Sequence, residues 1–376
     1  MGLADGIAQE ELAALRARGL LRSLEPLLTR AGAEIELRPG ERLINLSSND
    51  YLGLAGDGRI AAALAEGAAR WGAGAGASRL VCGDFAVEHE LEAALARFDG
   101  AEAAMLFGSG YAANCGLLPA FAGPGDLIAS DELNHASIID GCRLSRARVE
   151  VYPHGDVEAA ARLLQLPARR RLLVTDAVFS MDGDVAPLRE LSAVCEERGA
   201  ILVVDEAHAT GVVELPVAAE IRMSTHSKGL GLVGAHVAGS PAVCDLLVNR
   251  ARPLVFSTGL PPAVAHATLA ALRIVEGAEG AQRRARLFRN VARFSEGLKG
   301  LGLPVAKAVS PIIPLVLGDP DTALRVASRL RELGVLAKAI RPPTVPEGTS
   351  RIRFALSAAH TDAHLEAALD ALRKAL

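Results

Sequence analysis

Residues 200–208 read AILVVDEAH, and residues 221–231 read IRMSTHSKGLG. A short continuous apolar run that ends in acidic residues is typical of a buried parallel strand whose carboxyl end is wet. The second stretch holds another short strand candidate, so Asp205, His208 and Lys228 each follow a predicted strand. Because ligands of open α/β sheets bind at the carboxyl ends of strands, we expect these three side chains to share one site.

Lys228 stands out among the basic residues of the chain. Lysine and arginine together number 40, but only five of these residues are lysines, namely Lys228, Lys299, Lys307, Lys338 and Lys374. The other four lysines lie in the last third of the chain, where surface helices are expected. Lysine can lose its proton and form a Schiff base, which arginine cannot do. This difference makes Lys228 a candidate for covalent chemistry.

Composition restricts the class of protein. Half of the 376 residues are hydrophobic and 22% are charged, which indicates a packed core large enough for one large and one small domain. The formal net charge of −4 argues against a nucleic-acid-binding protein. The five cysteines form no CxxC pair, which fits a reducing compartment and argues against a disulfide framework or a metal site. Without a signal peptide or an apolar run of bilayer length, the expected location is the cytoplasm and no membrane segment is expected.

Predicted strands and helices alternate from residue 86 onward. The strand candidates lie at 102–107, 126–130, 149–152, 171–178, 200–205, 221–225 and 232–238. This alternation predicts an α/β fold in which a mostly parallel sheet is covered by helices on both faces. Glycines at 72–79 follow a predicted helix with GxGxG spacing. A dinucleotide-binding motif would follow a strand with GxGxxG spacing, so an NAD-dependent oxidoreductase is not supported.

The two ends of the chain have a different pattern. Residues 8–30 predict an amphipathic helix, and residues 34–46 predict a short hairpin around Pro39-Gly40. After a helical stretch at 262–300, strand-like runs alternate with helices and predict a small α+β domain; the runs are 312–317, 335–340 and 351–356, and the helices 321–333 and 361–375. We therefore divide the chain into an N-terminal segment (1–45), a large domain (46–275) and a small C-terminal domain (276–376).

Several polar residues lie where predicted strands end. Each of them fits either a ligand contact or a purely structural role. Ser109-Gly110-Tyr111 opens a predicted helix, whose free N–H groups bind phosphate well, although Ser109 fits an ordinary helix cap. His135 follows the strand at 126–130 and fits either a flat ring or a structural role. Ser180 precedes an Asp-Gly turn and fits a ligand contact or the turn itself.

Asp205 and the arginines of residues 351–353 are stronger candidates for binding a cofactor or substrate. A buried carboxylate needs a partner, and the protonated nitrogen of a pyridine ring would be one; the alternative is a cap on the next helix. Arg351 and Arg353 share a face of a predicted strand. An arginine fork suits a substrate carboxylate, and a structural salt bridge is the alternative.

Taken in chain order, these motifs resemble the α-oxoamine synthases. The order is a strand followed by Ser-Gly-Tyr, then His135, then Phe-Ser-Met-Asp-Gly-Asp at 179–184, then Asp205-x-x-His208 and Thr225-x-x-Lys228. The resemblance extends from about residue 22 to residue 360. It implies that the chain is a pyridoxal-phosphate enzyme with the aspartate-aminotransferase-like fold (PLP fold type I). That fold has a three-layer α/β/α large domain and a small α+β domain. It also implies a homodimer.

The resemblance assigns roles to individual residues. Lys228 would hold the cofactor as a Schiff base, Asp205 would pair with the pyridine nitrogen, His208 would contact the ring oxygen, and His135 would stack on the ring. Gly110, Tyr111, Ser180 and Thr225 would line the cofactor. Thr258, with Ser257, matches a motif that reaches the phosphate bound in the neighbouring subunit. Arg353 matches the arginine that holds the amino-acid carboxylate, and Arg22 and Thr344 match further substrate contacts.

Substrate choice rests on the run at 339–349. It is similar to the version in the family member that condenses L-alanine with pimeloyl-CoA, or the acyl-carrier-protein thioester, in biotin synthesis. Sister enzymes that use glycine with acetyl-CoA or serine with a long acyl-CoA are the alternatives, and a non-catalytic relative is a remote one. The chain departs from the family pattern between His208 and Lys228, where residues 212–220 form a shorter connection. We expect the cofactor to bind, and any effect of this departure to fall on dimer contacts or thioester access.

Overall fold

The computed structural model describes residues 2–217 and 219–376. Its largest sheet has seven strands in the order β3-β9-β8-β7-β6-β4-β5. The strands are β3 (Ala103–Phe107), β4 (Leu127–Asp131), β5 (Arg148–Tyr152), β6 (Arg171–Asp176), β7 (Ile201–Asp205), β8 (Ile221–Thr225) and β9 (Ala235–Gly239). Every pair from β8 to β5 is parallel, and β9 is antiparallel to both of its neighbours. The predicted mostly parallel sheet is therefore confirmed.

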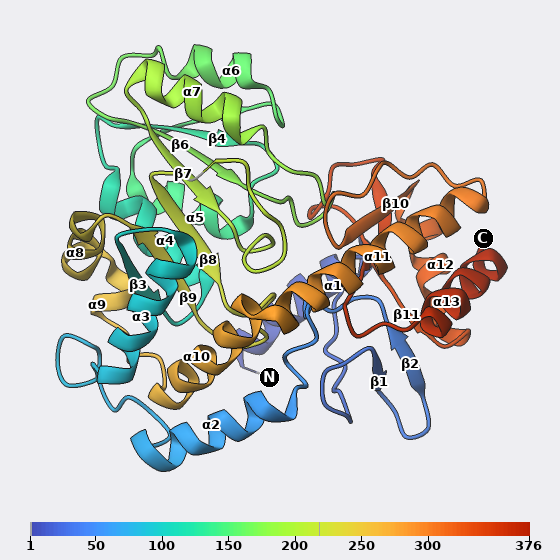
Figure 1. The fold of residues 1–376 in the computed structure, drawn as a ribbon. Coiled ribbons are helices and arrows are strands. Elements are labelled where there is room, and N and C mark those ends of the chain that lie inside the picture. Colours follow the sequence, from blue (N-terminus) through green and yellow to red (C-terminus); the bar gives the residue numbers. More distant parts are fainter. Residues whose placement is uncertain (1, 218) are drawn as a thin grey trace.

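Helices cover both faces of this sheet, because its strands are apolar on both sides (Figure 1). In β7, Val203 packs into one core and its neighbours Leu202 and Val204 pack into another. The first core includes residues of α4 (Gly110–Phe121), α5 (Ala136–Ser145), α8 (Pro241–Arg250) and α9 (Arg252–Val255), and the second includes residues of α6 (Val157–Leu163) and α7 (Leu188–Arg198). Successive residues of a strand point to opposite faces, so this division confirms three layers.

A third core joins the large sheet to the C-terminal part. Its helices are α2 (Gly58–Trp71), α3 (Ala86–Asp99), α10 (Pro262–Glu276), α11 (Ala278–Gly300), α12 (Pro320–Glu332) and α13 (Asp362–Ala375). The predicted helical stretch at 262–300 is interrupted at Gly277, whose backbone is extended and serves as the boundary of both α10 and α11. Figure 1 shows α11 running from the large sheet toward the C-terminal elements.

The C-terminal part contains two small sheets. One is antiparallel with the order β10-β13-β12, formed by β10 (Ile312–Gly318), β12 (Lys338–Ile340) and β13 (Ser350–Ala355). The other has the order β1-β2-β11, formed by β1 (Glu34–Glu36), β2 (Arg42–Asn45) and β11 (Val335–Leu336). The N-terminal hairpin is thus present as predicted, and β2 pairs with β11 of the C-terminal part. The division of the chain into domains at residues 45 and 275 stays a prediction.

The N-terminal helix is shorter than predicted. Helix α1 covers Leu3–Ala17, and the chain from 18 to 33 is not helical. Gly19 adopts a φ of 66°, in the left-handed region, directly after the helix. Helix α1 buries none of its residues, so tertiary packing does not extend it. Within residues 2–217 and 219–376, the structure has no helix that is both long and apolar enough to span a bilayer.

Candidate active site

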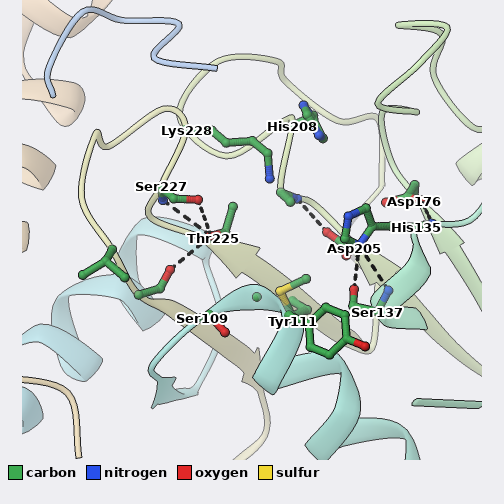
Figure 2. Close-up of a pocket in the computed structure, with 15 residues that line it drawn as sticks. Ser109, Tyr111, His135, Ser137, Asp176, Asp205, His208, Thr225, Ser227 and Lys228 are labelled. Atoms are coloured by element: carbon green, nitrogen blue, oxygen red, sulfur yellow. Dashed lines mark hydrogen bonds between the residues drawn. The ribbon is translucent and has the colours of Figure 1, made fainter. Parts of the chain in front are cut away.

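The ends of β6, β7 and β8 and the first turns of α4 and α5 surround a cavity of about 200 Å³ (Figure 2). Parallel strands bring consecutive carboxyl ends to one edge, which explains why residues far apart in sequence meet there. The sequence-predicted residues that line this cavity are Gly110, Tyr111, His135, Asp205, His208, Thr225 and Lys228. These seven residues therefore meet in the folded chain, whereas Ser180, which was also expected to line the cofactor, does not line this cavity.

Asp205 is buried at the end of β7 and held by neutral donors. Its Oδ2 accepts from Asn114 Nδ2 at 2.8 Å, and its Oδ1 accepts from the Ala207 backbone N–H at 2.9 Å. Asp176 ends the neighbouring strand β6 in register with Asp205 and accepts from the His135 backbone N–H at 2.7 Å. Burial and the nearby charge of Asp205 raise the pKa of Asp176 well above its usual value. The raised pKa favours the protonated form of Asp176 beside the carboxyl group of Asp205.

Lys228 lies on the turn between β8 and β9. The turn is closed by backbone bonds, from His226 N–H to the Gly234 carbonyl at 2.9 Å and from Leu232 N–H to the His226 carbonyl at 3.0 Å. Burial lowers the pKa of the Lys228 amine, although the nearby Asp205 opposes this shift. A lowered pKa increases the fraction of neutral amine, which is the nucleophilic form.

The connection at 212–220 leads into β8, which ends just before this turn. Thr210 donates through Oγ1 to the Glu206 carbonyl at 2.8 Å, and Val212 is buried in the core. Ile221 then begins β8 in register with Val203 of β7. Residue 218 lies outside the described residues. Lys228 thus lines the strand-end cavity after the connection at 212–220.

The two histidines of the cavity are held differently. His135 caps α5, and its Nδ1 lies 2.8 Å from Ser137 Oγ. Partial desolvation lowers the pKa of His135 despite the opposing charge of Asp205. His208 is buried, and its Nδ1 lies 2.6 Å from the hydroxyl of Tyr51. Burial, and then the charge of Lys228, lower the pKa of His208 well below its usual value, so this ring is neutral.

One end of the cavity is built to accept an anion. Ser109 caps α4 by accepting from the Ala112 N–H at 3.1 Å, which confirms the structural explanation of this serine. It also lines the cavity, beside Gly110 at the start of the helix. The hydroxyls of Thr225 and Ser227 lie 3.0 Å apart on the same wall. Free N–H groups at a helix start and neighbouring hydroxyls are the donors that phosphate groups use in proteins.

These features fit pyridoxal phosphate. Figure 2 shows Asp205, His135 and Lys228 around the same space, with Ser109 and Thr225 on the neighbouring wall. The aldehyde would meet the Lys228 amine, and the ring nitrogen would meet the buried carboxylate of Asp205. The phosphate would meet the start of α4. Each polar part of the cofactor thus has a partner of suitable chemistry in this chain.

A second cavity of about 550 Å³ shares His135 with the first. Ser180 and Thr344 line it, together with apolar side chains that include Leu133, Ile139 and Phe179. The sequence-predicted substrate contact Thr344 therefore lies next to the cofactor side of the site. A largely apolar cavity adjoining a polar one suits a substrate with a polar reacting end and an apolar chain.

The two arginines of β13 have separate partners. Arg351 forms an ion pair with Asp182, which is the structural salt bridge considered above. Arg353 donates from Nε to the Ser180 carbonyl and from Nη2 to Asn49 Oδ1 at 3.1 Å. Arg353 is 8% exposed. These bonds fix the plane of its guanidinium and leave further N–H groups for a carboxylate.

Arg353 lines neither cavity, and two further sequence-predicted residues also lie outside both of them. Arg22 is exposed on the segment after α1. Thr258 is also exposed and lines a separate small cavity with Ser257. Its loop is held to the glycine-rich stretch through the Gly259 N–H, which donates to the Ala77 carbonyl at 3.0 Å. Neither residue joins the cluster around Lys228 within one chain.

Sequence reasoning missed three residues that support this cluster. Asp176 carries the same signal as Asp205, an acid that ends a buried strand, and could have been found by applying that rule to β6. Asn114 and Tyr51 carry no local signal of this kind, because their contacts depend on packing between distant segments.

Comparisons with known proteins identify relatives over nearly the whole chain. The family model for aminotransferase class I and II matches residues 41–372. The 8-amino-7-oxononanoate synthase of Anaeromyxobacter dehalogenans (strain 2CP-1) is 53% identical over 378 residues, covering 97% of this chain and 94% of that protein. The protein of the same name from Geobacter metallireducens is 48% identical over 373 residues, covering 96% and 95%.

Solved structures are similar over the same length. A structure of SPT (serine palmitoyltransferase) with a PLP internal aldimine has a TM-score of 0.92 at 30% identity, covering 100% of this chain and 98% of that one. The 8-amino-7-oxononanoate synthase from Francisella tularensis has a TM-score of 0.75 at 28% identity, covering 88% and 97%. These similarities agree with the predicted fold and with the predicted PLP cofactor.

Proposed function

The chain belongs to the aminotransferase class I and II family, and we propose that it condenses L-alanine with a pimeloyl thioester to give 8-amino-7-oxononanoate. It is a pyridoxal-phosphate enzyme of fold type I. The observation that carries the proposal is the meeting of Lys228, Asp205 and His208 in one cavity, in a chain with full-length relatives of that name. The reaction breaks the Cα–carboxylate bond of alanine as carbon dioxide, joins Cα to the acyl carbon, and releases the thiol.

When bound, pyridoxal phosphate supplies an electron sink that is conjugated with the amino group of alanine. Lys228 would anchor the cofactor and, once displaced by alanine, would accept the Cα proton on Nζ. Its lowered pKa suits this second task. Asp205 would keep a proton on the ring nitrogen, and His208 would donate to the ring oxygen. His135 would cover one face of the ring and exclude water from it.

The remaining residues would position the substrates. Arg353 would hold the alanine carboxylate with the N–H groups that Asn49 and Ser180 leave free. The apolar cavity that Thr344 lines would accept the acyl chain. Holding both substrates beside the cofactor removes most of the entropy cost of their meeting.

The alternative within the family is serine with a long acyl thioester. It is supported by the TM-score of 0.92 to SPT at 30% identity. The 53% identity to a named 8-amino-7-oxononanoate synthase, over nearly the whole chain, favours alanine and a pimeloyl thioester. A third pair, glycine with acetyl-CoA, is the remaining sister activity.

We further propose that the protein acts as a homodimer in the cytoplasm. Large apolar side chains are exposed around the loop of Thr258, including Val81 at 76% and Phe256 at 71%. Helix α1 also leaves apolar residues uncovered, with Leu3 85% exposed. A second subunit that covers these surfaces would bring Thr258 to the phosphate bound by its partner. The five free cysteines support a reducing compartment.

Thiol release by the purified protein with pyridoxal phosphate tests this function. Three pairs are compared: alanine with pimeloyl-CoA, glycine with acetyl-CoA, and serine with palmitoyl-CoA. Release with the first pair alone, and none from the Lys228→Ala variant, is the expected result. Release with only one of the other pairs would retain the mechanism and overturn the substrate assignment.

A further inference from the structure

The hydroxyl of Tyr51 lies at a junction between two residues of the site. It is 2.6 Å from His208 Nδ1 and 3.3 Å from Asn49 Oδ1. Tyr51 is fully buried, and its carbonyl accepts from the Ala358 N–H at 2.8 Å. The turn is fixed further by Asp50, whose Oδ1 accepts from the Leu54 N–H at 2.8 Å. These hydrogen bonds fix the backbone around Tyr51, and with it the position of the hydroxyl.

The direction of the hydroxyl proton follows from the competition between the two acceptor atoms beside it, Asn49 Oδ1 and His208 Nδ1. Asn49 Oδ1 already accepts from Arg353 Nη2 at 3.1 Å, and it lies farther from the hydroxyl than His208 Nδ1 does. Burial raises the pKa of Tyr51 to about 12, so the hydroxyl keeps its proton. The short contact is then an O–H group donating to the lone pair of an imidazole nitrogen.

A donated bond at Nδ1 determines the rest of the ring. His208 is neutral, so only one of its nitrogens carries a proton. With Nδ1 as the acceptor, that proton is on Nε2, at the other end of a ring that lines the cavity with Lys228. A neutral N–H donor stabilises an oxygen anion without adding a third positive charge beside Lys228 and Arg353.

We propose that Tyr51 is a positioning residue that fixes His208 in the Nε2–H tautomer, so that the single ring N–H of His208 serves the cavity. Only the identity of the acceptor, the ring oxygen of bound pyridoxal phosphate, rests on the proposed function. Through Asn49 the same hydroxyl also lies near Arg353, but the guanidinium of Arg353 donates independently to the Ser180 carbonyl. The loss of the hydroxyl therefore acts on His208 first.

The chain offers a matched control. Tyr152 is 1% exposed, and its hydroxyl has no hydrogen-bond partner among the residues that the structure describes. It lies at the end of β5, outside the cavity of Lys228. Tyr152→Phe and Tyr51→Phe each remove one buried hydroxyl from an otherwise unchanged ring, and only the second removes the partner of His208.

The test is nitrogen-15 NMR of histidine-labelled protein loaded with pyridoxal phosphate, repeated without it. The His208 signals are assigned by their loss in His208→Gln. We expect the Nε2–H pattern in the wild type and in Tyr152→Phe, and a mixture of tautomers in Tyr51→Phe. With alanine and pimeloyl-CoA, kcat should fall about tenfold in Tyr51→Phe while KM for alanine changes less than about twofold, as for other residues that orient a site through a neighbour.

Two results would overturn the proposal: an Nδ1–H pattern in the wild type, or the same His208 pattern in Tyr51→Phe as in Tyr152→Phe. The NMR result does not depend on the reaction. A protein that shifts its tautomer in Tyr51→Phe but releases no thiol with any substrate pair would support the role of Tyr51 and reject the proposed function.

Discussion

The two sides of the candidate site differ in how they are built. On the cofactor side, Asp205, His208 and Lys228 line one cavity, and buried hydrogen bonds fix the first two. Away from this cavity, Thr344 lies in a neighbouring cavity on the substrate side, and Thr258 is exposed on a loop. The first side depends on the edge of a parallel sheet within one chain. The second depends on loops and, in our proposal, on a second subunit.

This difference explains which side a single chain can complete. Strand ends converge because hydrogen bonding sets the spacing of parallel strands, so residues there meet whatever the loops do. Loop residues meet a ligand only when other segments place them. The cofactor side should therefore be sensitive to single substitutions within one chain, and Thr258 should be sensitive to the partner chain.

The largest expected effect is at Lys228. Lys228→Ala should lower the rate of thiol release by at least about a thousandfold, because both the covalent anchor and the base are lost. Lys338→Ala is the control, since Lys338 is exposed and pairs only with Glu25 in the salt bridges of the described residues. A Lys228→Ala variant that keeps a tenth of the wild-type rate would show that Lys228 is neither the covalent anchor nor the base.

At Arg353 we expect a selective effect on alanine. Arg353→Lys should raise KM for alanine about 10- to 100-fold, because a lysine cannot make the planar fork that holds a carboxylate. Arg351→Lys is the control, because it makes the same substitution two residues away, where the arginine pairs with Asp182. Initial rates over a range of alanine concentrations measure both. An equal rise of KM in the two variants would show that β13 is sensitive to any change, and that Arg353 has no special role.

Thr258 tests whether the phosphate side is shared between subunits. Thr258→Ala should weaken binding of pyridoxal phosphate about fivefold, the effect of one lost hydrogen bond. Mixed dimers of Thr258→Ala and Lys228→Ala chains sharpen the test. If Thr258 serves the partner, the one site that keeps Lys228 receives an intact threonine and binds the cofactor with wild-type affinity. Fivefold weaker binding at that site would place Thr258 in the site of its own chain.

The smallest expected effect is at His154, which anchors the turn that carries Ser180. Its ring lies 3.1 Å from Asp131 and 2.8 Å from Asp184, and it packs edge-on against Phe179 at 4.3 Å between centroids. Hydrogen bonds to Asp131 and then Asp184 raise the pKa of His154 to about 10. The unfolded chain has an ordinary value near 6.5, so the added stability is complete below that pH and is lost as pH rises through about 10.

Urea unfolding of the wild type and His154→Gln at several pH values measures this difference. We expect the wild type to be more stable by about 1–2 kcal/mol at pH 6, with the difference largely gone above about pH 10. A difference that stays constant over this range would mean that the charge of His154 does not stabilise the turn.

The sequence predicted that Asp205, His208 and Lys228 meet, and they do, because the signals for their positions are local. Apolar runs that end in acids located β7, and the position of Lys228 after β8 placed the amine at the same edge. Asp176 was missed although it ends β6 with the same pattern, in register with Asp205. Tyr51 could not be found in this way, because 157 residues separate it from His208 and only the folded chain brings them together.

The N-terminal helix is a case in which a local sequence signal gave a wrong prediction. Periodicity predicted a helix over 8–30, but the structure ends it at Ala17, because no packing supports its continuation past Gly19. Arg22 lies on the non-helical segment that follows, exposed and away from the cavity. Local amphipathic pattern states which face a helix would bury; it does not state whether a surface exists to receive that face.

The most direct measurement is the identity of the residue that carries the cofactor. Reduction of the loaded protein with borohydride fixes a Schiff base as a stable bond, and digestion with mass spectrometry locates the pyridoxyl group. We expect this group on the peptide that contains Lys228, and we expect it to be absent from the Lys228→Ala variant. A pyridoxyl group on Lys299, Lys307, Lys338 or Lys374 instead, or on no lysine, would contradict it.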